Sequence, residues 1–405
     1  PGTAAGRFCA TSEFPSCGWA CLMEFLFWFS FFLLFYIYFG YPLAIKAVAA
    51  VRPRPVHKLD DFQPKVSILI AAFNEAKDIE ATLCNKLEQD YPKHLMEILV
   101  ISDESDDGTD QIVETVAEGA PCPVYPYRQV PRQGKTAGLN TLYQHATGDI
   151  LLFSDANSQW DPQALQKLVS NFSDPEVGYV TGKMVYVNKD GSLVGDGCSA
   201  YMKYENWLRY QETLVGSVVG VDGGIDAMRK SLYQPLRADQ LPDFVQPLKV
   251  VEQGARVVYE PEALLKEEAL SDSGSEFSMR VRVSLRALSA LKDMAHVLNP
   301  VNHGLYALQL HSHKLLRYYA FIPLALLAIT NTVLASDNTW YLLAFIGQAA
   351  SYLLAWCGHQ QKDNPDLPPS IGISYYFVLL NTACLQAALA FARGEKKVIW
   401  DPRKG

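Results

Sequence analysis

The chain has 405 residues, which is enough for more than one domain. Its formal net charge of −8, without a basic stripe that carries interleaved aromatic residues, argues against nucleic-acid binding. Hydrophobic residues make up 49% of the chain, and they gather near the N-terminus and in the last quarter of the sequence. The eight cysteines have no paired spacing, which favours free thiols in a reducing compartment.

The N-terminal part predicts one membrane-spanning helix. Residues 1–21 are small and polar without a pattern, so we expect a disordered N-terminus. Residues 22–51 are almost continuously apolar and long enough to span a bilayer, which takes about 20 residues. This apolar stretch is too long for a cleaved signal peptide. Basic residues lie at its end and just beyond it, and by the positive-inside rule they place the next part of the chain in the cytoplasm. These residues are Lys46, Arg52, Arg54 and Lys58.

The middle of the chain predicts strands that alternate with helices. Apolar runs over 66–73, 97–102 and 150–153 are typical of buried strands, and the first is followed by a predicted helix that ends near Leu87. The motif Arg132–Asn140 is expected to precede a further helix. This order favours an α/β domain built on a mostly parallel sheet.

Polar side chains follow the third of these strands. Asp155 and Asn157 come directly after the apolar run, and ligands bind at the carboxyl ends of strands in open α/β sheets. Their hard oxygen atoms suit Mg²⁺ or Mn²⁺ that carries a nucleotide diphosphate. The alternative is a polar turn, because Ser, Asp and Asn also end strands without binding anything.

Four stretches in this order resemble the family 2 glycosyltransferases: VSILIAAFNEA, LVISDESDDGTD, RQGKTAGLN and GDILLFSDANSQWDP. The similarity is closest to the membrane-embedded polysaccharide synthases, such as cellulose, chitin and hyaluronan synthases, and it covers roughly residues 64–290. It implies a cytoplasmic domain of the GT-A type that binds a nucleotide sugar, flanked by transmembrane and interfacial helices. It also implies a metal-dependent hexosyltransferase that inverts the anomeric centre and takes its sugar from a UDP-sugar.

The resemblance assigns roles to residues at the strand ends. Ala72, Phe73, Glu75 and Asp103 stand where the family binds uracil and ribose. Lys135 follows Gly134, as in the family's Gly-Lys pair that meets the diphosphate or the sugar, although an exposed surface lysine is the alternative.

Three departures from the family pattern concern the metal, the base and the acceptor. Asp155 and Asn157 match the family's metal motif, with Asn in place of a second Asp. Asp243 matches the general base, with Pro242 where many members carry another acid. Arg286 stands where the family's Gln-x-x-Arg-Trp motif binds diphosphate, but Val283 and Ala287 occupy its Gln and Trp positions. The sequence leaves open whether Asp226 lines the acceptor site or starts a helix.

The C-terminal part predicts interfacial helices over 293–316 and transmembrane helices within 318–392, as apolar spans over 318–335, 340–357 and 371–392. The basic tail 393–405 should face the cytoplasm. Three complete crossings after a cytoplasmic domain would leave it outside. We therefore expect one segment to be re-entrant or interfacial.

The resulting hypothesis is an integral protein of the inner or plasma membrane that transfers sugar from a UDP-sugar to a growing polysaccharide, which could leave through its own membrane helices. Its expected partners are the UDP-sugar, a glycan or lipid-linked acceptor, and membrane lipids. Two alternatives stay open. One is a single transfer to a lipid acceptor, which the missing Trp favours, and the other is a non-catalytic membrane protein that binds a sugar nucleotide.

Overall fold

The computed structural model describes residues 16–187, 197–268, 273–361 and 368–395. In this part of the chain one eight-stranded sheet has the order β3-β2-β1-β4-β7-β6-β8-β5. The prediction of an α/β fold on a mostly parallel sheet is confirmed, with two antiparallel pairs around β7 and one at β5. The strands are β1 Val66–Ala72, β2 Met96–Ser102, β3 Val124–Arg128, β4 Ile150–Asp155, β5 Gln159–Trp160, β6 Val177–Val187, β7 Asp226–Arg229 and β8 Arg256–Glu268.

The parallel half of the sheet is buried on both faces. Every residue of β1 and of β2 is buried, which explains their unbroken apolar runs. One face packs against α3, α4 and α6, and the other against α5 and α8. These helices are α3 Ile79–Leu87, α4 Thr109–Glu118, α5 Lys135–His145, α6 Ala164–Ser170 and α8 Pro242–Glu252.

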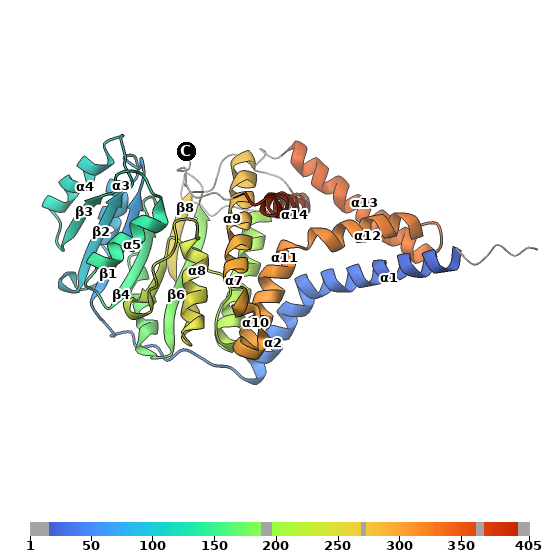
Figure 1. Cartoon of the computed structure of the whole chain (residues 1–405), viewed down its shortest axis with the longest axis horizontal. Coiled ribbons are helices and arrows are strands. Elements are labelled where there is room, and N and C mark those ends of the chain that lie inside the picture. Colours follow the sequence, from blue (N-terminus) through green and yellow to red (C-terminus); the bar gives the residue numbers. More distant parts are fainter. Residues whose placement is uncertain (1–15, 188–196, 269–272, 362–367, 396–405) are drawn as a thin grey trace, which may run out of the picture.

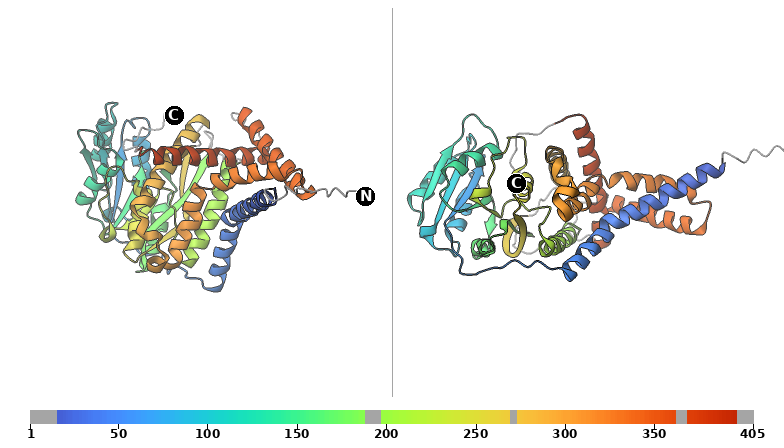
Figure 2. Two further views of the ribbon diagram at one scale, coloured as in Figure 1. Left: turned by 45° about the vertical axis from the view of Figure 1, so that its right-hand side comes forward. Right: turned by 60° about the horizontal axis from the view of Figure 1, so that its bottom comes forward.

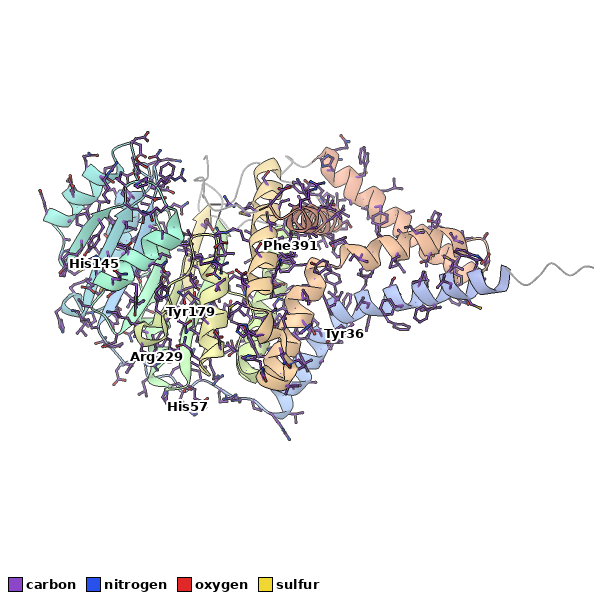
Figure 3. All side chains as sticks on the ribbon, in the orientation of Figure 1. Tyr36, His57, His145, Tyr179, Arg229 and Phe391 are labelled. Atoms are coloured by element: carbon purple, nitrogen blue, oxygen red, sulfur yellow. The ribbon has the colours of Figure 1, made fainter. Side chains whose placement is uncertain are left out.

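One local expectation was wrong, and one of two open alternatives is excluded. The motif Arg132–Asn140 does not precede a helix, because α5 already begins at Lys135 within it. Asp226 does not start a helix, because it is the first residue of β7 and pairs with Thr181 of β6. Its neighbour Tyr179 is buried in the same sheet (Figure 3).

A layer of helices separates the sheet from the membrane-type helices (Figure 1). The helix α9 packs along α14, and α7 packs along α2 and α14. The members of this layer are α7 Gly197–Val215, α9 Ser273–Asp293, α10 Pro300–Leu310, the π-helical turn η6 His311–Leu315 and α11 Leu316–Tyr318.

Three apolar helices of the described chain are long enough to cross a membrane: 19–51, 339–360 and 369–392. The first comprises α1 Ser16–Phe35, a π-helical turn Tyr36–Gly40 and α2 Tyr41–Val51, and the others are α13 Thr339–Gln360 and α14 Pro369–Ala392. Figures 1 and 2 place α1 and α13 on the side of the molecule away from the sheet.

The predicted span 318–335 is a short helix, α12 Phe321–Leu334, bent by 57° from the preceding segment Pro300–Tyr318. At about 1.5 Å per residue α12 is shorter than a hydrocarbon core of about 30 Å. The basic tail led to the expectation that one of the C-terminal apolar segments is re-entrant or interfacial. The bent segment that contains α12 is the candidate for it. Residues 1–15 of the predicted disordered terminus and 396–405 of the predicted tail lie outside the described residues.

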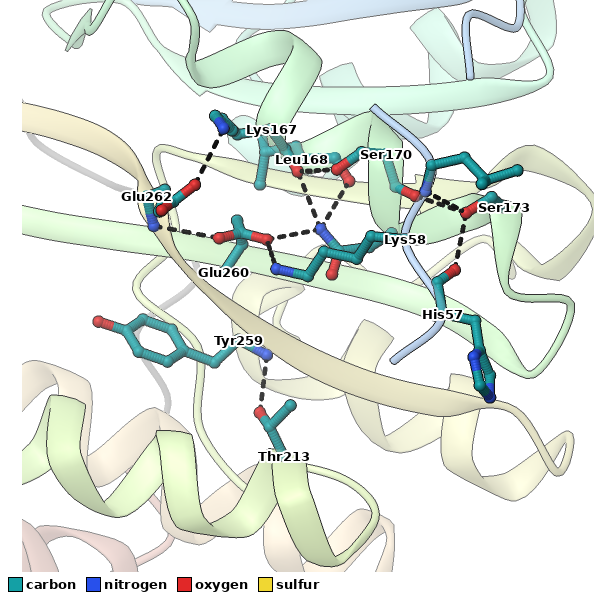
Figure 4. A network of polar contacts seen from close by, with 12 residues as sticks. His57, Lys58, Lys167, Leu168, Ser170, Ser173, Thr213, Tyr259, Glu260 and Glu262 are labelled. Carbon is teal, nitrogen blue, oxygen red and sulfur yellow. Dashed lines mark hydrogen bonds and ion pairs between the residues drawn. The ribbon is translucent and has the colours of Figure 1, made fainter. Parts of the chain in front are cut away.

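The segment after α2 is docked on the sheet domain (Figure 4). Lys58 forms an ion pair with the buried Glu260 of β8, and the backbone N–H of Arg54 donates to the Leu214 carbonyl at 2.6 Å. The Ser173 hydroxyl donates to the carbonyl of His57 at 2.8 Å. These contacts fix the first membrane helix relative to the site described next.

Candidate functional site

A cavity of about 630 Å³ lies between the carboxyl ends of β1 and β4 and the helices that face the membrane segments. Six of the predicted site residues line it, and they come from five separate segments. They are Glu75, Lys135, Asp155, Asn157, Asp243 and Arg286. Topology therefore brings together residues that are up to 211 positions apart in the sequence, the separation of Glu75 and Arg286.

Ala72, Phe73 and Asp103 do not line this cavity. The Asp103 carboxylate accepts hydrogen bonds from the backbone N–H groups of Gln133 and Gly134, both at 2.9 Å, so it holds the loop that leads into α5. The Arg132 guanidinium lies 3.4 Å from the centre of the Phe73 ring. In this arrangement Asp103 positions Lys135, and the nucleotide-binding roles of these three residues stay predictions.

Lys135 and Asp155 form an ion pair at the carboxyl end of β4. Lys135 is the first residue of α5, after Gly134 with φ of +90°, a conformation that favours glycine. The two side chains are 30% and 40% exposed, so both can reach a ligand. Burial lowers the pKa of Lys135, but the carboxylates of Asp155 and Asp243 outweigh it and raise the pKa, so the ammonium stays charged.

The donor atoms fit a divalent cation that shares its ligands with a nucleotide. No group of three or more His, Cys, Asp or Glu side chains comes together as a metal site within the described residues. Mg²⁺ in nucleotide sites needs only one or two carboxylates, because phosphate oxygens and waters complete its shell. Asp155 and Asn157 on the cavity wall offer one carboxylate and one amide oxygen for this purpose.

Asp243 is the second residue of α8, and its Oδ1 atom is buried without a hydrogen-bond partner among the described residues. Burial raises the pKa of this carboxyl, Lys135 and Arg286 oppose the rise, and the Asp155 charge adds to it, with a net increase. A carboxylate with a raised pKa and a free oxygen can accept a proton from a substrate hydroxyl.

Arg286 of α9 donates to the Gln240 carbonyl at 3.0 Å, while its Nε atom is buried without a hydrogen-bond partner in the part of the chain described here. Burial lowers the pKa of the Arg286 guanidinium, and the charge of the nearby Asp243 opposes this decrease only in part. Ala287 is completely buried against α8, so the position of the family's Trp points into the core and not into the cavity.

The loop 220–224, which contains three glycines, lies against the carboxylates of Asp243 and Asp155. A Cβ atom on Gly223, whose φ is +87°, would lie 2.8 Å from Oδ2 of Asp243. One on Gly224 would lie 3.2 Å from Oδ2 of Asp155. Asp222, directly before Gly223, pairs with Arg209 of α7 at 2.5 Å. Close approach of this backbone to two carboxylates therefore requires glycine.

Residues 67–234 match the family model Glycosyl transferase family 2. This part of the chain is a family 2 glycosyltransferase domain. The match covers β1 to β7, with Lys135, Asp155 and Asn157, and stops before Asp243 and Arg286.

Curated relatives extend the similarity beyond that domain. The chain is 27% identical over 251 residues to a poly-beta-1,6-N-acetyl-D-glucosamine synthase of Staphylococcus aureus, covering 61% of this chain and 59% of that protein. It is 29% identical over 197 residues to a beta-monoglucosyldiacylglycerol synthase of Trichormus variabilis, covering 46% of this chain and 41% of the relative. The matched stretch thus spans about three-fifths or less of these relatives' own length.

A solved structure shares the fold over nearly the whole chain. It is a mannosyltransferase from Pyrobaculum calidifontis in complex with GDP-Man and Mn2+, with a TM-score of 0.70 and 22% identity over 92% of this chain and 99% of that one. At this identity the likeness shows the fold alone, including the arrangement of the GT-A-like sheet and the helices around it.

Sequence patterns missed several residues on the cavity wall. Arg282, Lys314 and Tyr376 line it and come from the part of the chain after the family match. Gly223 was also missed, because its φ of +87° and its close approach to Asp243 are visible only in the structure.

Proposed function

We propose that this protein is a metal-dependent inverting hexosyltransferase that uses a UDP-sugar and extends a glycan at the membrane. The observation that carries the proposal is the convergence on one cavity of Lys135, Asp155 and Asn157 from the family 2 glycosyltransferase domain with Asp243, which follows that domain. We further propose that the sheet domain faces the cytoplasm and that Asp155 and Asn157 bind Mg²⁺ or Mn²⁺.

The residues divide into two groups by what they do in the transfer. Asp243 accepts the proton of the acceptor hydroxyl while that oxygen attacks the anomeric carbon of the donor. The bond between this carbon and the diphosphate oxygen breaks, and UDP leaves with the bonding electrons. Lys135 and Arg286 stabilise the charge that develops on the diphosphate. A bound divalent cation would neutralise the same diphosphate.

Growth of a polysaccharide is the first candidate for the overall reaction. It is supported by similarity to a poly-beta-1,6-N-acetyl-D-glucosamine synthase, whose name describes a polymer product. Repeated transfer would require the product's end to stay in the cavity as the next acceptor.

Single transfer to a lipid is the second candidate. The cavity extends from Asp243 to side chains of the membrane-type helices, including Phe39, Phe377 and Leu380. An apolar wall next to a general base suits an acceptor with a hydrocarbon chain. The name of the Trichormus variabilis relative, a lipid glucosyltransferase, supports the same reading.

The test is UDP release by the full chain in detergent, with Mg²⁺ or Mn²⁺, a panel of UDP-sugars, and Asp243→Asn in parallel. We expect turnover with one donor, and a loss of about 10²- to 10⁴-fold in kcat for the variant, as for removal of a general base. The affinity for UDP should persist, because the amide replaces the carboxylate without a change in shape.

Product length separates the two candidates. A ladder of glycans on a gel supports polymer growth, and one glycolipid species supports single transfer. A folded protein that binds UDP but releases none from any donor or acceptor would contradict the enzyme and favour the non-catalytic alternative.

A further inference from the structure

Lys314, in η6, is a cation on the cavity wall that the transfer chemistry does not use. It has neither a hydrogen bond nor an ion pair with any described residue. The neighbouring arginines, in contrast, each have an ion pair: Arg209 pairs with Asp222 at 2.5 Å, and Arg317 pairs with Glu205. A charge withdrawn from water without a partner is costly, so its position indicates a ligand that supplies the partner.

The carboxylates near Lys314 are already engaged by other groups. The buried His313 places Nε2 at 3.0 Å from Glu205 and Nδ1 at 2.7 Å from Glu212. Glu205 also binds Arg317, and Glu212 accepts the Tyr41 hydroxyl at 2.5 Å. Glu205 and Glu212 lie near enough to act on the charge of Lys314, but neither forms an ion pair with it in the described part of the chain.

The glycine loop places this ammonium near the proposed base. A Cβ atom on Gly220 would lie 2.7 Å from Cε of Lys314, and one on Gly223 would lie 2.8 Å from Oδ2 of Asp243. The two glycines are three positions apart, so their Cα atoms are at most about 11 Å apart. Lys314 and Asp243 therefore lie against one short loop and line the same cavity.

Apolar side chains of the membrane-type helices line the same cavity as Lys314. Tyr38 and Phe39 of the first membrane helix and Ile373, Phe377 and Leu380 of α14 contribute to its wall. An acceptor that fills it would have an apolar chain at one end and an anionic group close to the attacking oxygen.

We propose, on the basis of the proposed function, that Lys314 binds the phosphate group of a lipid-linked acceptor. A compact ammonium acts on phosphate as a point charge, and Lys135 would perform the corresponding task for the donor diphosphate on the other side of Asp243. The phosphate supplies the ion partner that Lys314 lacks among the described residues, and the lipid chain extends along α14.

The experiment compares acceptors that differ only in charge. The full chain in detergent receives its UDP-sugar with a long-chain isoprenyl phosphate, with the uncharged isoprenyl alcohol of the same length, or with diacylglycerol. UDP release is measured for the parent chain and for Lys314→Met, with UDP affinity determined in parallel. Lys203→Met is the matched control, because Lys203 is an exposed lysine on α7.

We expect the parent chain to prefer the phosphate, and Lys314→Met to lower kcat/KM for it by at least about tenfold, the effect of one charge-assisted hydrogen bond. Lys314→Arg should restore part of that preference. Gly220→Ala, which displaces the ammonium but keeps its charge, should cause the same selective loss. Lys203→Met should behave as the parent chain.

Three results would overturn the inference while leaving the transferase intact: equal use of charged and uncharged acceptors by the parent chain, an unchanged preference in Lys314→Met, or a loss of UDP affinity in that variant, which would assign Lys314 to the donor. Absence of UDP release from every donor and acceptor would instead contradict the proposed function itself.

Discussion

At the scale of single residues, the pKa of Asp243 decides the pH range in which transfer runs. Burial raises this pKa, and the positive charge of Arg286 opposes the rise. Because the base must be ionised, activity should fall as the pH drops, and the fall should begin above the ordinary pKa of Asp, about 3.9. Arg286→Met removes a charge that lowers the pKa, so the acid limb should move to higher pH.

The pH profile of kcat, measured with saturating donor, checks this prediction. Its shape is informative even if the variant also binds diphosphate less tightly, because saturation removes the binding effect. Arg393→Met is the control, since this arginine is 70% exposed at the end of α14. An acid limb that stays in place in Arg286→Met would show that Asp243 does not control the rate.

Asp226 should influence stability instead of catalysis. Its carboxyl is 1% exposed in the sheet, and burial raises its pKa well above the ordinary value, against hydrogen bonds from Thr181 and Tyr179. Between the unfolded and the folded pKa the folded state binds more protons, so its stability declines as the pH rises. Asp226→Asn should flatten this decline and raise the Tm at alkaline pH.

Thermal unfolding in detergent at several pH values measures the effect. Asp60→Asn, at an exposed position of the segment after α2, should leave the slope unchanged. A steeper decline in Asp226→Asn, or the same slope as in the parent chain, would contradict the assignment of the pH dependence to this carboxyl.

At the scale of elements, the loop 220–224 should be more sensitive than its composition indicates. Gly223 combines a φ of +87° with backbone contact to the Asp243 carboxylate. Gly223→Ala should cost about 1–3 kcal/mol of stability through strain and should lower kcat by displacing the base. Gly119→Ala is the matched control, because no atom approaches that glycine and its φ is −104°.

The expected contrast is a lower Tm and a lower kcat for Gly223→Ala, and a change within about 1 kcal/mol for the control. UDP release and thermal unfolding of the same samples give both values. Normal kcat in a folded Gly223→Ala would show that the loop does not determine the position of the carboxylate.

The sequence predicted the elements that depend on local pattern. Apolar runs located β1, β2 and β4 to within two residues, because burial on both faces leaves no polar alternation. The polar residues that follow those strands include Glu75 and Asp155, and both line the same cavity. Lys314 could not be found in this way, because its relation to Asp243 arises only when η6 packs against the glycine loop.

Asp103 shows the limit of strand-end reasoning. Its position after β2 is as predicted, yet its carboxylate is directed to backbone N–H groups of the loop before α5 and not to the cavity. Which way a strand-end side chain turns depends on the loop beside it, and the spacing of motifs carries no information on that.

At the scale of the whole molecule, the cavity joins the sheet domain to the membrane helices, so orientation in the membrane decides from which side the donor enters. Basic residues after the first span favour the cytoplasmic sheet domain that we propose, by the positive-inside rule. The start of α13, just after the turn between α12 and α13, lies beside α1, where Trp28 donates to the Tyr341 hydroxyl at 3.3 Å. The turn is therefore on the side of the molecule away from the sheet (Figure 1).

An epitope inserted after Asp337 in that turn should therefore be accessible from outside intact spheroplasts, and one inserted after Gly119 only after permeabilisation. Both positions are exposed or lie in turns of the structure, so the insertions should be tolerated. Accessibility of the Gly119 epitope in intact spheroplasts would place the donor site outside, where a cytoplasmic UDP-sugar could not reach Lys135. Protection of both epitopes would mean that α12 turns back within the bilayer, so that the bend of 57° marks a re-entrant segment.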